Sequence, residues 1–286
     1  MRWPPARSAA AVALLAMLAI ATFPVRAGAQ EPQDKPAVLT QAEVGDNACG
    51  PCVLINSLAR GDAKLKSLLD VIPGETRHDQ VRHIIKKYGS KPSEEYKGKK
   101  PRYQETSGIT WIDMRHIVNE LFADYELDPV QGTYLDRGKK EPLAEHLKRV
   151  HRLLARSLKA GFPPLLSVRS FYAKDQGKEG KEFLWEGLHG HWVTVVDIQP
   201  DLADNEKGFR FGYADPSTGK IEYGYAYFDE ARSFTAAKGN AEKWEWLTDR
   251  PFLCVVAPSL RLQTQTTPWS SRTVIILNYA IYREPS

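Results

Sequence analysis

The sequence predicts an α+β protein in which helices come first and an antiparallel sheet follows. In the first part of the chain, apolar residues recur at helical spacing, and glycine or proline stands near the ends of the segments. In the second part, short apolar runs are separated by polar turns, as expected for strands joined by hairpins. Helices followed by antiparallel strands are the arrangement of an α+β fold.

Residues 1–29 have the three parts of a signal peptide. A basic start with Arg2 and Arg7 is followed by an apolar stretch over 9–23, and Ala27-Gly28-Ala29 forms a small-x-small cleavage signal. The apolar stretch is too short, and too soon followed by the cleavage signal, for a membrane span, and no other stretch is suited to cross a bilayer. We therefore expect a secreted or periplasmic protein without a membrane span after cleavage.

The charge of the processed chain argues against nucleic acid as a partner. Residues 1–29 carry three of the 39 Lys and Arg residues and none of the 35 Asp and Glu residues, so the formal net charge falls from +4 to +1 on cleavage. The apparent basicity belongs largely to the export signal, and a nucleic-acid-binding function loses its support. With three cysteines the chain is not a disulfide scaffold either.

The processed chain of about 255 residues is long enough for one compact domain with a sizeable core. We expect a polar, proline-containing lead-in at residues 30–40, one domain over 41–260 and a C-terminal tail over 261–286. The tail has no assigned role. Its apolar run, residues 274–281, fits either an extra edge strand or a docked tail.

Helical periodicity marks five segments, residues 49–60, 65–71, 78–88, 109–125 and 141–160. In the first of them, Pro51 suits the first turn of a helix and Gly61 suits its end. Residues 89–104, with many lysines and two prolines, predict a solvated loop.

Strands are expected at residues 164–171, 190–198, 209–215, 221–228 and 252–257. The charged residues 172–186 are expected to form a loop that leads into the second strand, and the polar residues 199–208 to form a hairpin loop. Cys254 lies in an apolar run, so we expect it to be a buried strand residue.

The sequence Cys49-Gly50-Pro51-Cys52 fits two chemistries. A thioredoxin-type redox site needs its Cys-x-x-Cys at the end of a buried strand, and residues 41–48 form no such strand. Because helical residues follow the motif, we expect Cys49 at the N-terminus of a helix, where the macrodipole favours a thiolate. This placement favours a nucleophilic cysteine, which needs a base.

A base and a carboxylate occur further along the chain. His191 opens one predicted strand and Asp215 ends the next. If the two strands form a hairpin, antiparallel pairing places His191 opposite residue 216 and beside Asp215. Asp197, the rival acid, lies six residues from His191 on the same strand, roughly 20 Å away at about 3.3 Å per residue, which is too far to orient the ring.

These motifs together resemble papain-like cysteine peptidases of the bacteriocin-processing, double-glycine-leader type and their stand-alone relatives (cysteine peptidase family thirty-nine-like). The resemblance rests on Cys49-Gly50-Pro51 opening a helix, Gly190-His191-Trp192-Val193 opening a strand and Asp215-Pro216 ending the next. It implies a papain-like fold, with the nucleophile helix packed on a C-terminal antiparallel sheet. It also implies a triad of Cys49, His191 and Asp215.

Two positions depart from the family pattern. The family's oxyanion-hole glutamine stands closer to the nucleophile than Gln41, which precedes Cys49 by eight residues, so Gln41 and Asn47 both remain candidates. In papain the second cysteine of the motif is the nucleophile, which would point to Cys52. We favour Cys49 because Cys52 is expected one turn inside the helix. A structural Cys49–Cys52 disulfide without catalysis is the alternative.

Other residues of the predicted site have open roles. Period-2 alternation places His189 on the same strand face as His191, so it either lines the cleft or is the base itself. Trp192 and Trp185 either wall the cleft or pack in the core. The remaining histidines are expected to be surface or packing residues: His78, His83, His116, His146 and His151. Neither a zinc-ligand spacing nor a phosphate-binding glycine motif is present, so we expect no metal or cofactor.

The sequence thus predicts a secreted or periplasmic cysteine hydrolase, foremost a peptidase acting on a peptide or protein substrate. Attack by a thiolate on an amide, with a histidine moving the proton, is the chemistry of such a triad. An acyltransferase using the same triad and a catalytically degenerate binding module are the alternatives.

Overall fold

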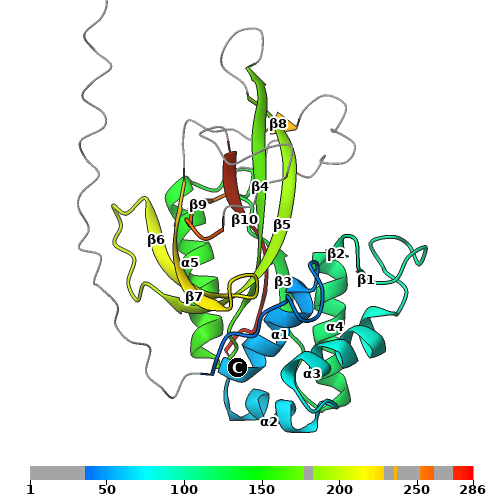
Figure 1. Cartoon of the computed structure of the whole chain (residues 1–286). Helices are drawn as coiled ribbons and strands as arrows, with labels where there is room; N and C mark the ends of the chain where they lie inside the picture. The colour runs from blue at the N-terminus through cyan, green and yellow to red at the C-terminus, as the bar shows by residue number, and fades with distance from the viewer. Residues whose placement is uncertain (1–35, 177–182, 229–234, 237–251, 261–272, 286) are drawn as a thin grey trace, which may run out of the picture. The chain divides into compact units, whose positions relative to one another are not determined.

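The helix predicted to begin at Cys49 is present and lies at the centre of the helical part. The computed structural model describes residues 36–176, 183–228, 235–236, 252–260 and 273–285. Helix α1 spans Cys49–Arg60, and nine of its residues are buried. Helices α2 (Ala63–Val71), α3 (Arg77–Ile84) and α4 (Trp111–Asp124) pack beside it, so that α1 lies between them and the sheet (Figure 1).

The helix ends follow local rules of capping. The side chains of Asp62, Thr76 and Thr110 accept hydrogen bonds from backbone N–H groups in the first turns of α2, α3 and α4. Helix α3 continues into a π-helical turn, η1 (Ile85–Gly89). The fifth helix, α5 (Leu143–Lys159), has an apolar face on the sheet. All five predicted helices are therefore confirmed. The ends of α1 are as predicted, and those of the other helices differ by at most two residues when η1 is counted with α3.

The sheet is antiparallel apart from one short parallel pairing. Its order is β3-β10-β4-β5-β6-β7-β9, and β9 pairs also with β10. The strands of this path are β3 (Gln131–Tyr134), β4 (Leu165–Gln176), β5 (Phe183–Ile198), β6 (Gly208–Asp215), β7 (Lys220–Tyr227), β9 (Cys254–Val256) and β10 (Thr273–Tyr282). The short β8 (Thr235–Ala236) pairs in parallel with β5. Because β9 joins β7 to β10, six strands close into a ring, and the α+β class is confirmed.

The sequence predicted an extra edge strand or a docked tail at residues 274–281. The structure has neither, because β10 lies inside the sheet. It pairs with β3 on one side and with β4 and β9 on the other, and all ten of its residues are buried. A continuous apolar run is typical of a strand that is covered on both faces. The compact unit accordingly runs from Pro36 to Ser286 rather than ending at residue 260.

The prediction of a loop at residues 172–186 is also wrong for most of this segment. Tyr172 pairs with Glu186 and Ala173 with Trp185, which makes β4 and β5 a long hairpin. Backbone pairing tolerates charged side chains, so the charge of this segment was a poor guide. Cys254 is buried in β9 as predicted.

Several short elements carried no clear sequence signal. The polar β3 is held by pairing with β10, and β1 (Tyr103–Gln104) with β2 (Gly108–Ile109) forms a small hairpin in the segment after η1. The predicted signal peptide lies outside the described residues, as do residues 30–35 and 261–272. Within the described part of the chain, no helix is long and apolar enough to cross a membrane.

Two buried contacts attach α1 to its surroundings. The hydroxyl of Thr194 on β5 donates a 2.9 Å hydrogen bond to the carbonyl oxygen of Val53. The side chain of Asn56 bonds both backbone groups of Leu39, at 2.8 and 3.1 Å. The described end of the predicted lead-in is therefore fastened to α1, and the start of this helix has a defined position against β5.

Candidate active site

Cys49 is the first residue of α1 and is half-buried at the base of a cleft. The residue before it, Ala48, caps the helix without a side-chain hydrogen bond. The first N–H groups of a helix have no intrahelical acceptor, so the backbone at Cys49 offers donors to a ligand. A Cβ atom at Gly50 would lie 2.4 Å from Cγ2 of Ile109, so the close packing of this turn requires glycine.

His191 and Asp215 form a buried pair. Nε2 of His191 lies 2.8 Å from Oδ1 of Asp215, and the two residues are 4% and 1% exposed. Asp215 also accepts a 2.8 Å hydrogen bond from the backbone N–H of Ser217, whose hydroxyl lies 3.2 Å from the same His191 nitrogen. Because Nε2 is engaged by these groups, Nδ1 is the nitrogen left for Cys49.

The strand pairing differs from the predicted register although the two side chains meet. Thr194 pairs with Ala214, and continuing this register places His191 opposite Ser217 rather than residue 216. The difference arises at the loop end, where Ile198 pairs with Phe211 rather than with Phe209, two residues away from the predicted register. A bulge at Val196 adds one residue to β5 and reduces the offset to one residue at His191. Asp197 is exposed opposite Gly212, as expected for a residue without a role in orienting His191.

The electrostatics of His191 link it to both neighbours. Burial alone would lower the pKa of His191, but the hydrogen bonds and charges of Asp215 and Cys49 outweigh it and raise this pKa from 6.5 to about 10. The imidazole is therefore held in its protonated form at neutral pH. A cationic ring in contact with a carboxylate and a sulfur is placed to exchange a proton beside that sulfur.

Cys52 has a different environment from Cys49. Its side chain is fully buried, and its Sγ lies 3.8 Å from the carbonyl oxygen of Thr40, to which it donates. Burial, and secondarily the charge of Cys49, raises the pKa of the Cys52 thiol to about 12. Cys49, Cys52 and Cys254 are all free thiols, so the structure contains no Cys49–Cys52 disulfide.

The two oxyanion-hole candidates, Gln41 and Asn47, both line the cleft beside Cys49. The amide of Asn47 donates a 2.7 Å hydrogen bond to the carbonyl oxygen of Glu105, and the amide of Gln41 donates to that of Asp46. Each amide carries a second N–H, so each can still donate to a ligand. The buried Oε1 atom of Gln41 finds no hydrogen-bond partner among the described residues.

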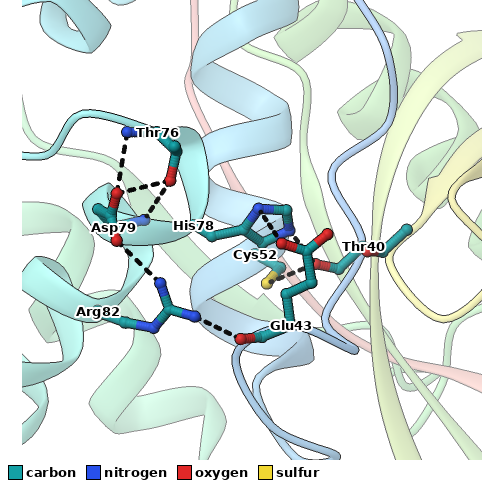
Figure 2. Close-up of polar contacts among 7 residues, drawn as sticks. All are labelled: Thr40, Glu43, Cys52, Thr76, His78, Asp79 and Arg82. Carbon is teal, nitrogen blue, oxygen red and sulfur yellow. Dashed lines mark hydrogen bonds and ion pairs between the residues drawn. The ribbon is translucent and has the colours of Figure 1, made fainter.

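The loop that carries Gln41 is held by contacts from α3 (Figure 2). Nε2 of His78 lies 3.1 Å from the carbonyl oxygen of Thr40, and Nδ1 lies 3.2 Å from the Glu43 carboxylate. Arg82 donates to the carbonyl oxygen of Glu43. Thr40 and Glu43 flank Gln41, so these contacts fix the position of its backbone. His78 is thus the packing residue expected from the sequence, with a contact on the site loop.

The cleft has a volume of about 650 Å³ and lies between the start of α1, the β1–β2 hairpin and the sheet. Trp192 is buried in its wall, and His189 is exposed at its rim. Partial desolvation, followed by the charges of His191 and Arg169, lowers the pKa of His189, which is the opposite of the shift at His191. The contacts to Asp215 therefore favour His191 as the base. Trp185 packs instead in a core cluster with Phe171.

The other histidines have packing or surface contacts. The ring nitrogens of His146 and His151 contact the carbonyl oxygens of Leu135 and Gln199 at 2.8 and 2.7 Å. In the part of the chain that the structure describes, no group of three or more His, Cys, Asp or Glu side chains could hold a metal ion.

Four polar residues of the site were not predicted. Ser217 could have been found from the sequence Asp215-Pro216-Ser217, because an aspartate commonly accepts a hydrogen bond from the backbone two residues on. Ser167, Arg169 and Asn278 line the cleft from β4 and β10. Their strands were partly predicted, but nothing local in the sequence marks their contact with the cleft.

No family model, curated protein or solved structure matches this chain.

Proposed function

We propose that this protein is a papain-like cysteine hydrolase, exported from the cytoplasm, that cleaves amide bonds in peptides. The main support is the buried 2.8 Å contact between Asp215 and His191, because His191 lines the same cleft as Cys49. These three groups come from the start of α1, the middle of β5 and the end of β6, so residues far apart in sequence converge on one site.

The residues have distinct roles in the proposed reaction. The Cys49 thiolate attacks the carbonyl carbon, and the resulting oxyanion accepts hydrogen bonds from the Cys49 backbone N–H and from Gln41 or Asn47. The imidazolium of His191 then gives its proton to the amide nitrogen as the C–N bond breaks, which leaves an acyl-thioester on Cys49. Neutral His191 next takes a proton from water, whose oxygen attacks the thioester, and the thiolate leaves.

Asp215 acts on His191 rather than on the substrate. Its carboxylate accepts the Nε2–H of the imidazole, which holds the ring with Nδ1 toward Cys49 and stabilises the imidazolium. Ser217 supports this carboxylate through its backbone N–H. Both groups are buried, so solvent screens their interaction weakly.

Thiol labelling tests this proposal directly. We expect a chloroacetamide or iodoacetamide probe to modify Cys49 selectively in the folded protein, with peptide mapping to identify the site, and His191→Ala to slow the labelling. Cys49→Ser should abolish hydrolysis of an unstructured protein substrate, whereas the matched control Cys254→Ser, at a buried cysteine of β9, should retain it. Equal labelling of the folded wild type and His191→Ala at Cys49 would contradict the proposal.

A further inference from the structure

A group of polar residues lines the cleft apart from the proposed triad. Ser167 and Arg169 lie on β4, and Asn278 lies on the neighbouring β10. Ser167 pairs with Tyr279 and Val168 with Leu277, so Asn278 is the extra residue of a β-bulge. Alternate residues of a strand share a face, which places Ser167 and Arg169 on the same side of the sheet. We call Ser167, Arg169 and Asn278 the floor cluster.

Asn278 is the most unusual member of the floor cluster. It is 1% exposed, and its Oδ1 atom finds no hydrogen-bond partner among the described residues. Buried polar atoms are nearly always hydrogen-bonded, because an unpaired one costs free energy. The unpaired amide oxygen of Asn278, in the lining of the cleft, is therefore suited to accept a hydrogen bond from an N–H group of a ligand.

Arg169 brings a positive charge to the same surface. It is half-buried, and burial lowers the pKa of its guanidinium to about 10 despite the opposing influence of Tyr134 and Tyr96. The guanidinium group also has the planar, two-pronged geometry that matches a carboxylate.

The floor cluster lies close to the proposed reacting groups. Arg169 pairs across the sheet with Gly190, the residue before His191. A Cβ atom at Gly190 would have no neighbour nearer than 4.0 Å, so the space above this position is open. A substrate held at Cys49 and His191 can therefore extend over Gly190 toward Arg169.

The geometry points to a carboxylate-binding subsite formed by Ser167, Arg169 and Asn278, through which the protein selects peptides that carry a carboxylate near the cleaved bond. This inference rests on the proposed peptidase function. Arg169 would bind the carboxylate in a two-pronged contact and the Ser167 hydroxyl would donate a further hydrogen bond to it, while Oδ1 of Asn278 accepts one from a backbone N–H of the same peptide. Two cleft carboxylates, Asp46 and Glu95, are exposed at the rim, where solvent screens them.

Two sources of the carboxylate fit this chemistry, the C-terminus of a peptide and an Asp or Glu side chain. We would immobilise the full Cys49→Ala protein and expose it to random hexapeptides made in two forms, with a free or an amidated C-terminus. A second mixture, amidated throughout, would contain either Glu or Gln at one position. Mass spectrometry of the eluted peptides then gives the enrichment of the charged form over its neutral match.

We expect the charged form to be enriched about tenfold in at least one mixture, as for a charge-assisted hydrogen-bonded pair, and that mixture identifies the source of the carboxylate. Arg169→Gln in the same protein should abolish the enrichment, and Asn278→Asp should weaken it through charge repulsion. The matched control Arg210→Gln, at an exposed arginine on β6 outside the cleft, should leave it unchanged. Thermal melting verifies that each variant folds.

Equal recovery of charged and neutral peptides, no recovery of either, or enrichment that survives Arg169→Gln would overturn the subsite. Hydrolysis by the wild type is measured separately on the same mixtures. Enrichment that depends on Arg169 without hydrolysis would contradict the peptidase proposal and support the subsite. Hydrolysis without a preference for the charged form would contradict the subsite alone.

Discussion

His191 and Asp215 are 24 residues apart in the chain, yet Nε2 of one lies 2.8 Å from Oδ1 of the other in a buried pair. His191 lies in the middle of β5, and Asp215 is the last residue of the neighbouring strand β6. This contact and the neighbouring Cys49 account for the raised pKa of the imidazole, and they lead to the predictions below.

Removing the carboxylate should impair catalysis without unfolding the protein. We expect Asp215→Ala to lower kcat by roughly 10²–10⁴-fold, the usual contribution of acid–base catalysis, because the ring loses its orientation and the imidazolium its partner. Asp215→Asn should be milder, since an amide oxygen can still hold the ring. Steady-state kinetics with circular dichroism distinguishes these effects. A fully active Asp215→Ala with an inactive Asp197→Ala would show that Asp197 has the orienting role.

The pH dependence of activity should have its alkaline limit near the pKa of His191. Because this pKa is raised from 6.5 to about 10, the imidazolium persists at neutral pH and loses its proton as pH rises through about 10. We expect kcat/KM to fall over that range, and the fall to move to lower pH in Asp215→Ala. An alkaline limb near pH 6.5 in the wild type would contradict the assigned electrostatics.

The same shift predicts a pH-dependent contribution to stability. A group whose pKa is higher in the folded state stabilises it fully below the unfolded pKa, about 6.5 for histidine, and loses this effect as pH rises through the folded pKa. The difference in the free energy of unfolding between the wild type and Asp215→Ala should thus be largest near pH 6 and shrink toward pH 10. Urea unfolding at several pH values measures it, and a difference that grows with pH would be inconsistent with this sign.

The two cysteines of the Cys-x-x-Cys motif should differ in their effects. Cys52 is buried with the pKa of its thiol raised to about 12, so it is not expected to act as a nucleophile. Cys52→Ala should retain at least about a tenth of the activity and lower the free energy of unfolding by about 1–2 kcal/mol through lost packing. Chemical unfolding and peptide hydrolysis test both effects. Activity in Cys49→Ser together with an inactive Cys52→Ala would reverse the assignment.

His78 should influence catalysis through the loop that carries Gln41. We expect His78→Ala to lower kcat several-fold, with a smaller change in KM, because Thr40 and Glu43 lose their contacts to the His78 ring. His78→Gln, which can still donate to the Thr40 carbonyl, should restore part of the rate. The matched control His83→Ala, on the same helix but outside the cleft lining and the contacts in Figure 2, should have little effect. Equal loss in His78→Ala and His83→Ala would indicate general destabilisation of α3.

Much of the fold could be predicted because it depends on local pattern. Apolar spacing and capping residues identified the five helices, and the continuous apolar runs identified most of the strands. The short strand β3 and the outer parts of β4 and β5 were missed because their pairing partners, and not their own composition, stabilise them. For the same reason the run at 273–282 was assigned to a tail, although β3, β4 and β9 surround it.

The sequence by itself determined which residues can form a cysteine, histidine and aspartate site, because Cys49 begins a helix and His191 and Asp215 stand at the ends of a hairpin. The tertiary structure decided the rest. The pairing of Ile198 with Phe211 and a bulge at Val196 set the register, and burial distinguished Cys52 from Cys49. The bulge at Asn278 and the pairing of β10 with β4 built the floor cluster. Burial and contacts between distant segments have no local signal, since they depend on how the whole chain packs.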